Sequence, residues 1–249
     1  MTSDAHPTDR FGVISDIHGN LEALQAVLAT LEIAGVGDIV CCGDVVGYGA
    51  SPNECVALLR TREIPTVLGN HDAAVLGSEE IESFNEMARD AVLWTRDVLT
   101  PENLAWLAAL PMTIERHGAF FVHASPCSPS EWNYVLTYVD AREAFNWFAQ
   151  PLCFLGHSHQ PFFIALANGE LYHIRQEEAP LDPLTRMLVN VGSVGQPRDR
   201  DPRAACVVVD SQARLIQLLR VDYDIAAAQA RIHRVGRHRG LAERLAHGC

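Results

Sequence analysis

Lysine is absent from this sequence: all 19 basic residues are arginine. A P-loop and a Schiff-base centre each need a lysine amine, so both kinds of site are excluded. No stretch approaches the ~18 apolar residues of a transmembrane helix, and the polar start of the chain lacks the apolar run of a signal peptide. We therefore expect a soluble, cytoplasmic protein with no membrane partner, in which residues 1–9 are disordered.

Cysteine is present, but not at the spacing of a structural metal site. The seven cysteines are odd in number, include no C-x-x-C pair and lie mainly in apolar runs. A zinc knuckle or a redox motif would require closely spaced cysteines. We therefore predict small buried thiols in a reducing compartment.

Acidic residues outnumber basic ones, and the formal net charge is −12. Such a chain repels nucleic-acid backbones on average, so we do not expect a nucleic-acid partner. A basic cluster near the end is interpreted as the solvated face of a terminal helix in preference to a nucleic-acid patch: Arg231, His233, Arg234, Arg237, His238 and Arg239. The length of 249 residues fits one large α/β domain over 1–249.

A series of short motifs rich in histidine and acid runs along the chain. They are Asp16-Ile17-His18-Gly19-Asn20, Gly43-Asp44, Gly69-Asn70-His71-Asp72, Val122-His123 and Gly156-His157-Ser158-His159. All offer oxygen or imidazole ligands and no thiolate, which suits manganese, iron, zinc or cobalt. Two divalent ions about 3.5–4 Å apart generate hydroxide at neutral pH and clamp both oxygens of a phosphoryl displacement. The series therefore predicts two divalent transition metal ions, with manganese expected to support activity.

The motifs resemble those of the calcineurin-like metallophosphoesterases, whose pattern runs D-x-H, G-D, G-N-H-D/E, a lone histidine and G-H-x-H. The match extends from Phe11 to about Pro161. The resemblance implies a four-layer α/β/β/α sandwich of the metallophosphoesterase type and the hydrolysis of phosphate esters. It also gives His71 the role of general acid, since a departing alkoxide needs a proton.

The predicted ligands divide between the two ions. Asp44 is assigned as the bridging carboxylate, because it is the only acid at the end of the second strand. The remaining assignments are Asp16 and His18 to the first ion, Asn70 and His123 to the second, and His157 and His159 to one ion each.

The loop after the second motif distinguishes branches of this superfamily. The phosphoprotein phosphatases continue G-D-x-V with Asp-Arg-Gly, whereas here Gly47-Tyr48-Gly49 follows and both the acid and the arginine are missing. In this respect the sequence is similar to small prokaryotic phosphodiesterase-like proteins. We expect a small phosphodiester or nucleotide-type substrate. The alternatives are a protein Ser/Thr phosphatase-like phosphomonoesterase and a non-catalytic, metal-free interaction scaffold on the same fold.

Strand patterns precede the first motifs, and helical patterns follow them. The run Phe11–Ser15 is followed by apolar residues at helical spacing, with Asn20 placed to cap that helix. Asp38–Cys42 repeats the strand pattern, and Ser51 then offers an N-cap before Pro52. Because ligands that follow strands lie at their carboxyl ends, we expect them to meet at one edge of the sheets.

The later sequence changes from helical to β character. Residues 79–110 are predicted to form a helical insertion beside the site, broken at Thr100-Pro101, and 224–245 a terminal helix broken near Gly236. Between them lie strand-like runs: Met112–Glu115, Ala119–His123, Leu152–Leu155, Phe162–Leu166, Glu170–Ile174, Met187–Val191, Ala204–Val209 and Leu215–Val221. Two sheets packed face to face between helical layers are therefore expected.

Some polar residues keep two interpretations at this point. Asp72 either orients His71 or caps the following turn. The glycine-rich stretch 190–198 is either an anion-binding loop, with Arg198 on a phosphate, or a tight turn with a solvated arginine. His117 lies in a predicted hairpin turn and is interpreted as a surface residue.

Overall fold

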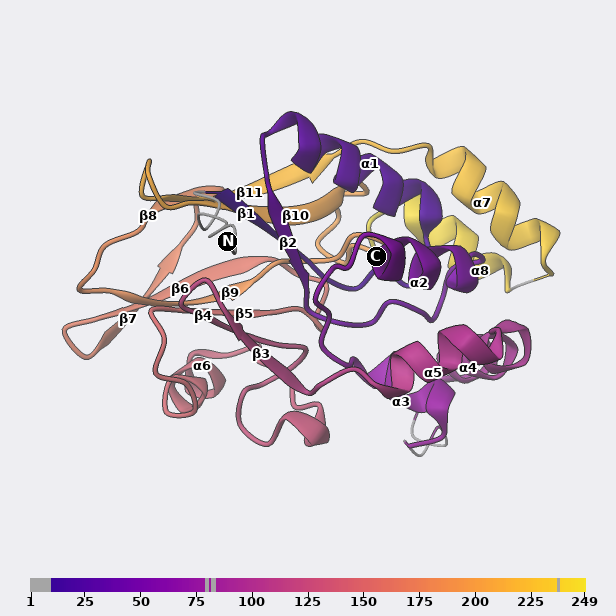
Figure 1. Ribbon diagram of the computed structural model, residues 1–249, viewed down its shortest axis with the longest axis horizontal. Coiled ribbons are helices and arrows are strands. Elements are labelled where there is room, and N and C mark those ends of the chain that lie inside the picture. The colour runs from indigo at the N-terminus through magenta and orange to yellow at the C-terminus, as the bar shows by residue number, and fades with distance from the viewer. Residues whose placement is uncertain (1–9, 79–80, 82–83, 237) are drawn as a thin grey trace, which may run out of the picture.

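The computed structural model describes residues 10–78, 81, 84–236 and 238–249. Two sheets lie face to face between helices (Figure 1). The first sheet has the order β2 (Asp38–Cys41), β1 (Arg10–Ile14), β10 (Ala204–Asp210), β11 (Leu215–Val221), β8 (Glu178–Pro180). The second has the order β3 (Thr113–Arg116), β4 (Ala119–Val122), β5 (Leu152–Leu155), β9 (Arg186–Asn190), β6 (Phe162–Ala167), β7 (Glu170–Ile174).

Helices cover the outer face of each sheet (Figure 1). Above the first sheet lie α1 (Leu21–Ile33) and α7 (Ile225–Arg234), and α6 (Tyr138–Ala144) packs under the second. The other helices are α2 (Pro52–Thr61), α3 (Asn70–Leu76), α4 (Glu86–Val98), α5 (Pro101–Ala108), α8 (Arg239–Glu243) and the short 3₁₀ turns η2 (Pro129–Glu131) and η3 (Arg244–Ala246). The predicted α/β/β/α sandwich is confirmed.

Strand residues alternate between two buried faces, because both sides of each sheet are covered. In β10, Val207 and Val209 join Phe154 of β5 in the core between the sheets. Their neighbours Cys206 and Val208 pack on the opposite face, against α1 and α2. The apolar run of β10 is therefore continuous because all seven of its side chains are buried.

The predicted elements are confirmed with a few differences. Before the third motif, Thr66 forms an isolated parallel bridge with Cys41 and no strand. Asn20 caps α1 by accepting a hydrogen bond from Ala23, whereas the Ser51 hydroxyl makes no such bond at α2. The short edge strand β8 escaped prediction because three residues ending in proline carry no alternating pattern.

The two predicted helical regions are present where the structure describes them. The break before α5 falls at Thr100, which accepts a hydrogen bond from Asn103, and the terminal helix ends before Gly236, whose φ is +71°. Residues 79–80 and 82–83 of the predicted insertion, the predicted disorder of 1–9, and Arg237 of the basic cluster lie outside the described residues. None of the described helices combines the length and apolar composition needed to cross a bilayer.

Candidate metal centre

The predicted ligands lie just beyond the ends of four strands and at the start of one helix. β1 and β2 run parallel in the first sheet, and β4, β5 and β9 run parallel in the second, so their carboxyl ends gather at one edge. Asp16 and His18 follow β1, Asp44 follows β2, His123 follows β4, His157 and His159 follow β5, and Asn70 begins α3. The fold thus brings together residues that are far apart in the sequence.

Backbone hydrogen bonds hold these loops to one another. The amide of Asp16 donates to the carbonyl oxygen of Gly43 at 3.0 Å, and the amide of His18 donates to that of Asp44 at 2.9 Å. The amide of Gly195, in the loop after β9, donates to the Asp16 carbonyl oxygen at 2.9 Å. The loops of both sheets therefore form one rigid support.

Several site residues adopt the left-handed backbone conformation, which costs a non-glycine residue about 1–3 kcal/mol. Their φ angles are 53° for Asp16, 49° for His18, 53° for Asp44, 65° for His157 and 59° for His159. Such strain persists only where the surrounding structure enforces it, as the interlocked loops do here. The backbone conformation is thus adapted to the direction of these side chains.

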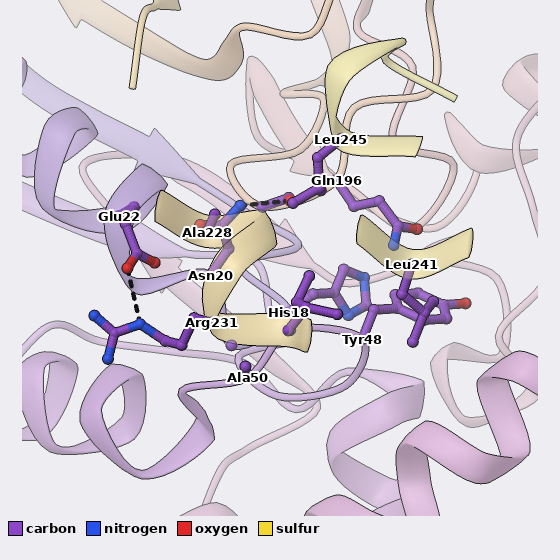
Figure 2. Close-up of a pocket in the computed structure, with 14 residues that line it drawn as sticks. His18, Asn20, Glu22, Tyr48, Ala50, Gln196, Ala228, Arg231, Leu241 and Leu245 are labelled. Atoms are coloured by element: carbon purple, nitrogen blue, oxygen red, sulfur yellow. Dashed lines mark hydrogen bonds and ion pairs between the residues drawn. The ribbon is translucent and has the colours of Figure 1, made fainter. Parts of the chain in front are cut away.

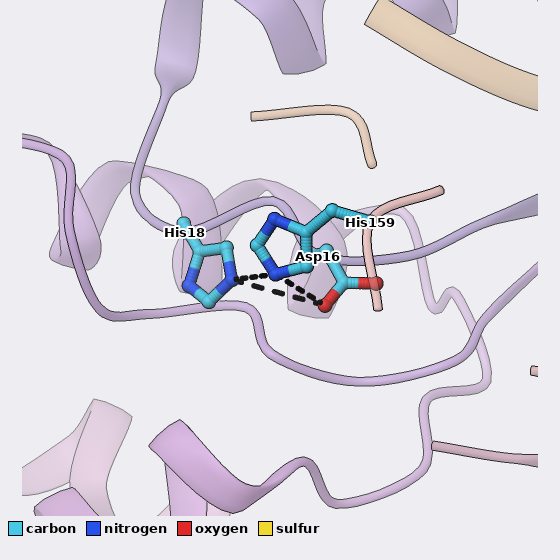
Figure 3. A group of neighbouring side chains, drawn as sticks. All are labelled: Asp16, His18 and His159. Atoms are coloured by element: carbon cyan, nitrogen blue, oxygen red, sulfur yellow. Dashed lines mark hydrogen bonds and ion pairs between the residues drawn. The ribbon is translucent and has the colours of Figure 1, made fainter. Parts of the chain in front are cut away.

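Asp16, His18 and His159 form a buried cluster in which both rings are turned toward the carboxylate (Figure 3). The Nε2 atoms of the two histidines lie 3.0 Å apart, and the Asp16 Oδ1 lies 3.2 Å from the Nε2 of His159. Oδ1 has no hydrogen-bond partner among the described residues, although it is buried. Three electron-rich atoms therefore converge on one small volume.

The tautomers of the ligand histidines follow from their other ring nitrogens. The Nδ1 atoms of His18, His123 and His159 each face a backbone carbonyl oxygen, at 3.1, 2.7 and 2.6 Å respectively. Because a carbonyl oxygen only accepts, we assign the hydrogen to Nδ1 in each case. The Nε2 lone pairs then point into the cluster, as they do in metal-ligating histidines.

Asp44 lies between this cluster and a second group of donors. Its Oδ2 is 3.6 Å from the Nε2 of His18 and 3.4 Å from the Nε2 of His123. The amide oxygen of Asn70 lies 3.1 Å from the same His123 atom. The ring of His157 lies 5.0 Å from that of His123, and its buried Nε2 has no partner among the described residues.

The charges of the site depend strongly on burial. Burial alone would raise the pKa of Asp16 and Asp44, but the neighbouring histidines hold both below their usual range. Burial alone would lower the pKa of His123, but the Asp44 carboxylate raises it to about 9. The site therefore carries excess negative charge, which a divalent cation would neutralise while leaving the Nε2 lone pair of His123 free to bind it.

His71 lies beside the donors without a clear partner. Its backbone amide donates to the Asp44 Oδ1 at 2.8 Å, and its buried ring Nδ1 has no hydrogen-bond partner among the described residues. One of its ring nitrogens is within 4.8 Å of ligand atoms of His18 and Asp44. Burial lowers the pKa of His71 to about 4, against the attraction of Asp44. An anionic substrate beside the ring would favour its cation.

The Asp72 carboxylate accepts hydrogen bonds from backbone amides. The donors are the amides of Val46 at 3.1 Å, Gly69 at 3.2 Å and Val45 at 3.3 Å. No bond to the His71 ring is present among the described residues. Neither interpretation of Asp72, orienting His71 or capping the following turn, describes these bonds: Asp72 caps the start of α3 from its third residue and holds the loop after Asp44 in place.

Gly156 permits the close approach of two loops. A Cβ atom added there would lie 2.0 Å from the Ser15 Oγ and 2.2 Å from the Asp16 Oδ2. The sequence showed the glycine of the G-H-x-H motif, but only the packed structure shows why a side chain cannot fit. Such contacts are shorter than any that real Cβ atoms make, so either the loop or the carboxylate must move.

The variant Gly156→Ala should therefore lose about 1–3 kcal/mol of unfolding free energy and also bind less metal. Thermal denaturation and metal analysis measure the two effects. Gly169→Ala is the control, because Gly169 has a φ of +80° and no atom within 4 Å of an added Cβ. It should cost only the ~1–2 kcal/mol of a left-handed alanine and keep full metal content. Unchanged metal binding in Gly156→Ala would contradict the proposed role of Asp16.

The backbone amides of the glycine-rich stretch 190–198 form hydrogen bonds within the chain. The amides of Val194 and Gly195 donate to the carbonyl oxygens of Ser15 and Asp16 in the loop after β1. Those of Gly192 and Gln196 donate to the side chains of Asn190 and Ser193 within the stretch. The anion-loop interpretation is therefore wrong for these backbone groups. Arg198 behaves differently: its Cζ lies 5.5 Å from the centre of the Tyr48 ring, and its buried Nε has no acceptor among the described residues.

A cleft of about 390 Å³ opens beside the donors. Its lining includes Asn70, His71 and His157 together with the aromatic residues Tyr48, Phe84, Trp132 and Tyr134. The Tyr134 ring stacks on His157 with 3.9 Å between ring centres. Phe84 was missed in the sequence, because an aromatic residue between two helices is usually a core residue.

His117 was interpreted as a surface residue, and it does lie in the turn between β3 and β4. It nevertheless stacks on Phe11, with 4.5 Å between ring centres, and its Nε2 lies 2.7 Å from Asp38. It is therefore only partly exposed and lies outside the donor clusters.

The chain matches the family model of the calcineurin-like phosphoesterase superfamily domain over residues 10–214. A curated relative from Methanocaldococcus jannaschii, itself uncharacterised, is 43% identical over 238 residues, covering 94% of this chain and 96% of that protein. The chain therefore belongs to the calcineurin-like phosphoesterase superfamily and is a hydrolase acting on phosphoric esters.

Two further proteins extend the comparison. The crystal structure of a metallophosphoesterase from Sphaerobacter thermophilus superposes with a TM-score of 0.83 at 40% identity, covering 96% of this chain and 99% of that one. A symmetrical bis(5′-nucleosyl)-tetraphosphatase from Chromobacterium violaceum is 32% identical over 118 residues, which is 45% of this chain and 41% of that enzyme.

Proposed function

We propose that the protein is a dinuclear metal-dependent phosphoesterase that hydrolyses a small phosphodiester or nucleotide-type ester. The proposed ligands are Asp16, His18, Asp44, Asn70, His123, His157 and His159, and the proposed general acid is His71. Divalent ions held there would supply activated water and positive charge for the phosphoryl group. Manganese is the ion we expect to support activity, because the donors are oxygen and imidazole.

One observation carries this proposal. The Nε2 atoms of His18 and His159 lie 3.0 Å apart, with the Asp16 carboxylate beside them and both Nδ1 hydrogens directed at carbonyl oxygens. No hydrogen is left to lie between these acceptors, so they repel one another unless a cation is bound. Burial of uncompensated polar atoms is costly, so the donor set fits a metal site.

The positions of Asp44 and His71 support the roles proposed for them, metal binding and proton transfer. The Asp44 Oδ2 lies 3.6 Å from the Nε2 of His18 in one donor group and 3.4 Å from that of His123 in the other, which fits a bridging carboxylate. His71 lines the cleft, which fits a general acid that protonates the leaving oxygen. The proton would then pass from the ring to the leaving alkoxide as the phosphorus–oxygen bond breaks.

The size and aromatic lining of the cleft favour a small substrate that carries a planar group. Its aromatic walls offer stacking surfaces next to the donors, and Tyr134 is 48% exposed. Its volume of about 390 Å³ suits a ligand of nucleotide size. The similarity to part of a bis(5′-nucleosyl)-tetraphosphatase also supports a nucleotide-type substrate.

A substrate panel with added Mn²⁺ tests this proposal. It comprises bis- and mono-p-nitrophenyl phosphate, 2′,3′- and 3′,5′-cyclic nucleotides, dinucleoside polyphosphates and a phosphopeptide. We expect at least one small diester or nucleotide to exceed the phosphopeptide in kcat/KM by about tenfold or more, equivalent to ~1.4 kcal/mol. A preference for the phosphopeptide over every diester would favour the phosphatase-like alternative.

The cytoplasmic location also remains our proposal. All seven cysteines lie in the described part of the chain and are free. Burial raises the pKa of thiols such as Cys41 and Cys153, which disfavours their oxidation. These features support a reducing compartment.

A further inference from the structure

Arg198 has neither a carboxylate partner nor, at its buried Nε, any hydrogen-bond partner among the described residues. Arg10, Arg203 and Arg220, by contrast, each form an ion pair with an aspartate. Among the described residues, Arg198 forms none: its Nη2 donates to the Gln196 Oε1 at 3.0 Å, and its Nε is buried without an acceptor. The buried, unpartnered Nε leaves a donor available for an anion, and guanidinium groups bind phosphate oxygens well.

The position of Arg198 ties it to the candidate metal centre. Its backbone amide donates to the carbonyl oxygen of His159 at 3.2 Å, so the residue is anchored to a proposed ligand. Its guanidinium lies against Tyr48, whose ring centre is 4.6 Å from that of His71. Figure 2 shows Tyr48 beside His18, under Leu241 of the C-terminal helices.

A second guanidinium lies against the same ring. The Cζ of Arg244 is 5.9 Å from the Tyr48 ring centre, and its Nε donates to the carbonyl oxygen of Cys249. Burial, followed by the charge of Arg198, lowers the pKa of Arg244. Two like charges on one aromatic ring repel each other, so a bound anion would stabilise both.

We propose that Arg198, with Arg244 against the same Tyr48 ring, forms a subsite for a second phosphate group, carried by the leaving group of the substrate. The inference rests on the proposed function. The leaving-group side is indicated because His71, the proposed donor to the leaving oxygen, contacts that ring. Water adds to the phosphorus atom and the bond to the leaving oxygen breaks. The leaving oxygen takes the proton that His71 donates. The second phosphate stays on the released product.

The test uses two esters with the same scissile bond. These are adenosine 2′,3′-cyclic phosphate and its 5′-phosphorylated form, both assayed with the Mn²⁺-loaded full chain. A third substrate, diadenosine tetraphosphate, tests a second phosphate that is bonded directly to the leaving oxygen. Arg198→Gln removes the charge and Arg198→Lys keeps it. Arg200→Gln is the matched control, because it removes an exposed arginine from the same loop.

The wild-type protein should prefer the 5′-phosphorylated ester, and Arg198→Gln should reduce that preference about 10- to 100-fold, as expected for a charged hydrogen bond. Arg198→Lys should retain part of it and Arg200→Gln all of it. An equal loss for both esters would mean that Arg198 binds the scissile phosphate and would overturn the proposal. No change would overturn it as well.

Calorimetry separates this inference from the proposed function. Adenosine 3′,5′-bisphosphate and AMP are titrated into the Mn²⁺-loaded wild type and Arg198→Gln. The bisphosphate should bind more tightly than AMP only to the wild type, whether or not any ester is hydrolysed. If the wild type hydrolyses nothing, the proposed function fails, and the binding difference alone decides the subsite. Equal affinities in the wild type would reject the subsite.

Discussion

Asp44→Asn should abolish activity and release at least one metal ion. Asp44 lies within reach of both donor groups, and its pKa is held below the usual range by His123 and His71 although burial alone would raise it. Removing a shared charge loses several kcal/mol of transition-state stabilisation, so the rate should fall by at least about 10³-fold. Metal analysis should give a stoichiometry that drops from roughly two ions per chain to one or fewer.

A matched variant separates this effect from a general change of charge. Asp97→Asn makes the same substitution on the exposed face of α4, and it should keep both the activity and the metal content. Circular dichroism should show that both variants are folded. If Asp44→Asn kept full activity and both ions, the assignment of Asp44 as a bridging ligand would be wrong.

His71→Ala should keep both ions and lose about 10²–10⁴ in rate, the usual range for general acid catalysis. The loss should be large for an alkyl or ribose leaving oxygen, because such an alkoxide needs a proton as it departs. It should shrink for p-nitrophenolate, which leaves readily without one. Steady-state kinetics with both kinds of ester, together with metal analysis, measure these effects.

The same experiment distinguishes an acid from a ligand at this position. Distance alone does not, since a ring nitrogen of His71 lies within 4.8 Å of ligand atoms of His18 and Asp44. Loss of a metal from His71→Ala would identify His71 as a ligand. Equal losses for both leaving groups would make His71 a positioning residue. Because the proposed ligand Asn70 is unchanged in this variant, any loss of metal would be due to His71 itself.

Much of the fold was accessible from local patterns. The strands β5, β7 and β11 begin and end at the predicted residues, because turn residues on either side bound these short runs locally. β8 was not predicted: its three residues carry no local pattern, and they form a strand only by pairing with β11. That the whole chain forms one domain stays a prediction.

The motifs by themselves determined the donor types and their order after successive strands, which was enough to predict a site of oxygen and imidazole ligands. Tertiary structure alone decided which donors meet: His18 and His159 are separated by 141 positions in the sequence and approach to 3.0 Å. It also decided that carbonyl oxygens face Nδ1 of the histidines and that Arg198 and Arg244 meet at Tyr48. The residue types that follow each strand are determined by the local sequence. Which of these residues meet depends on how the strands pair and how the two sheets pack.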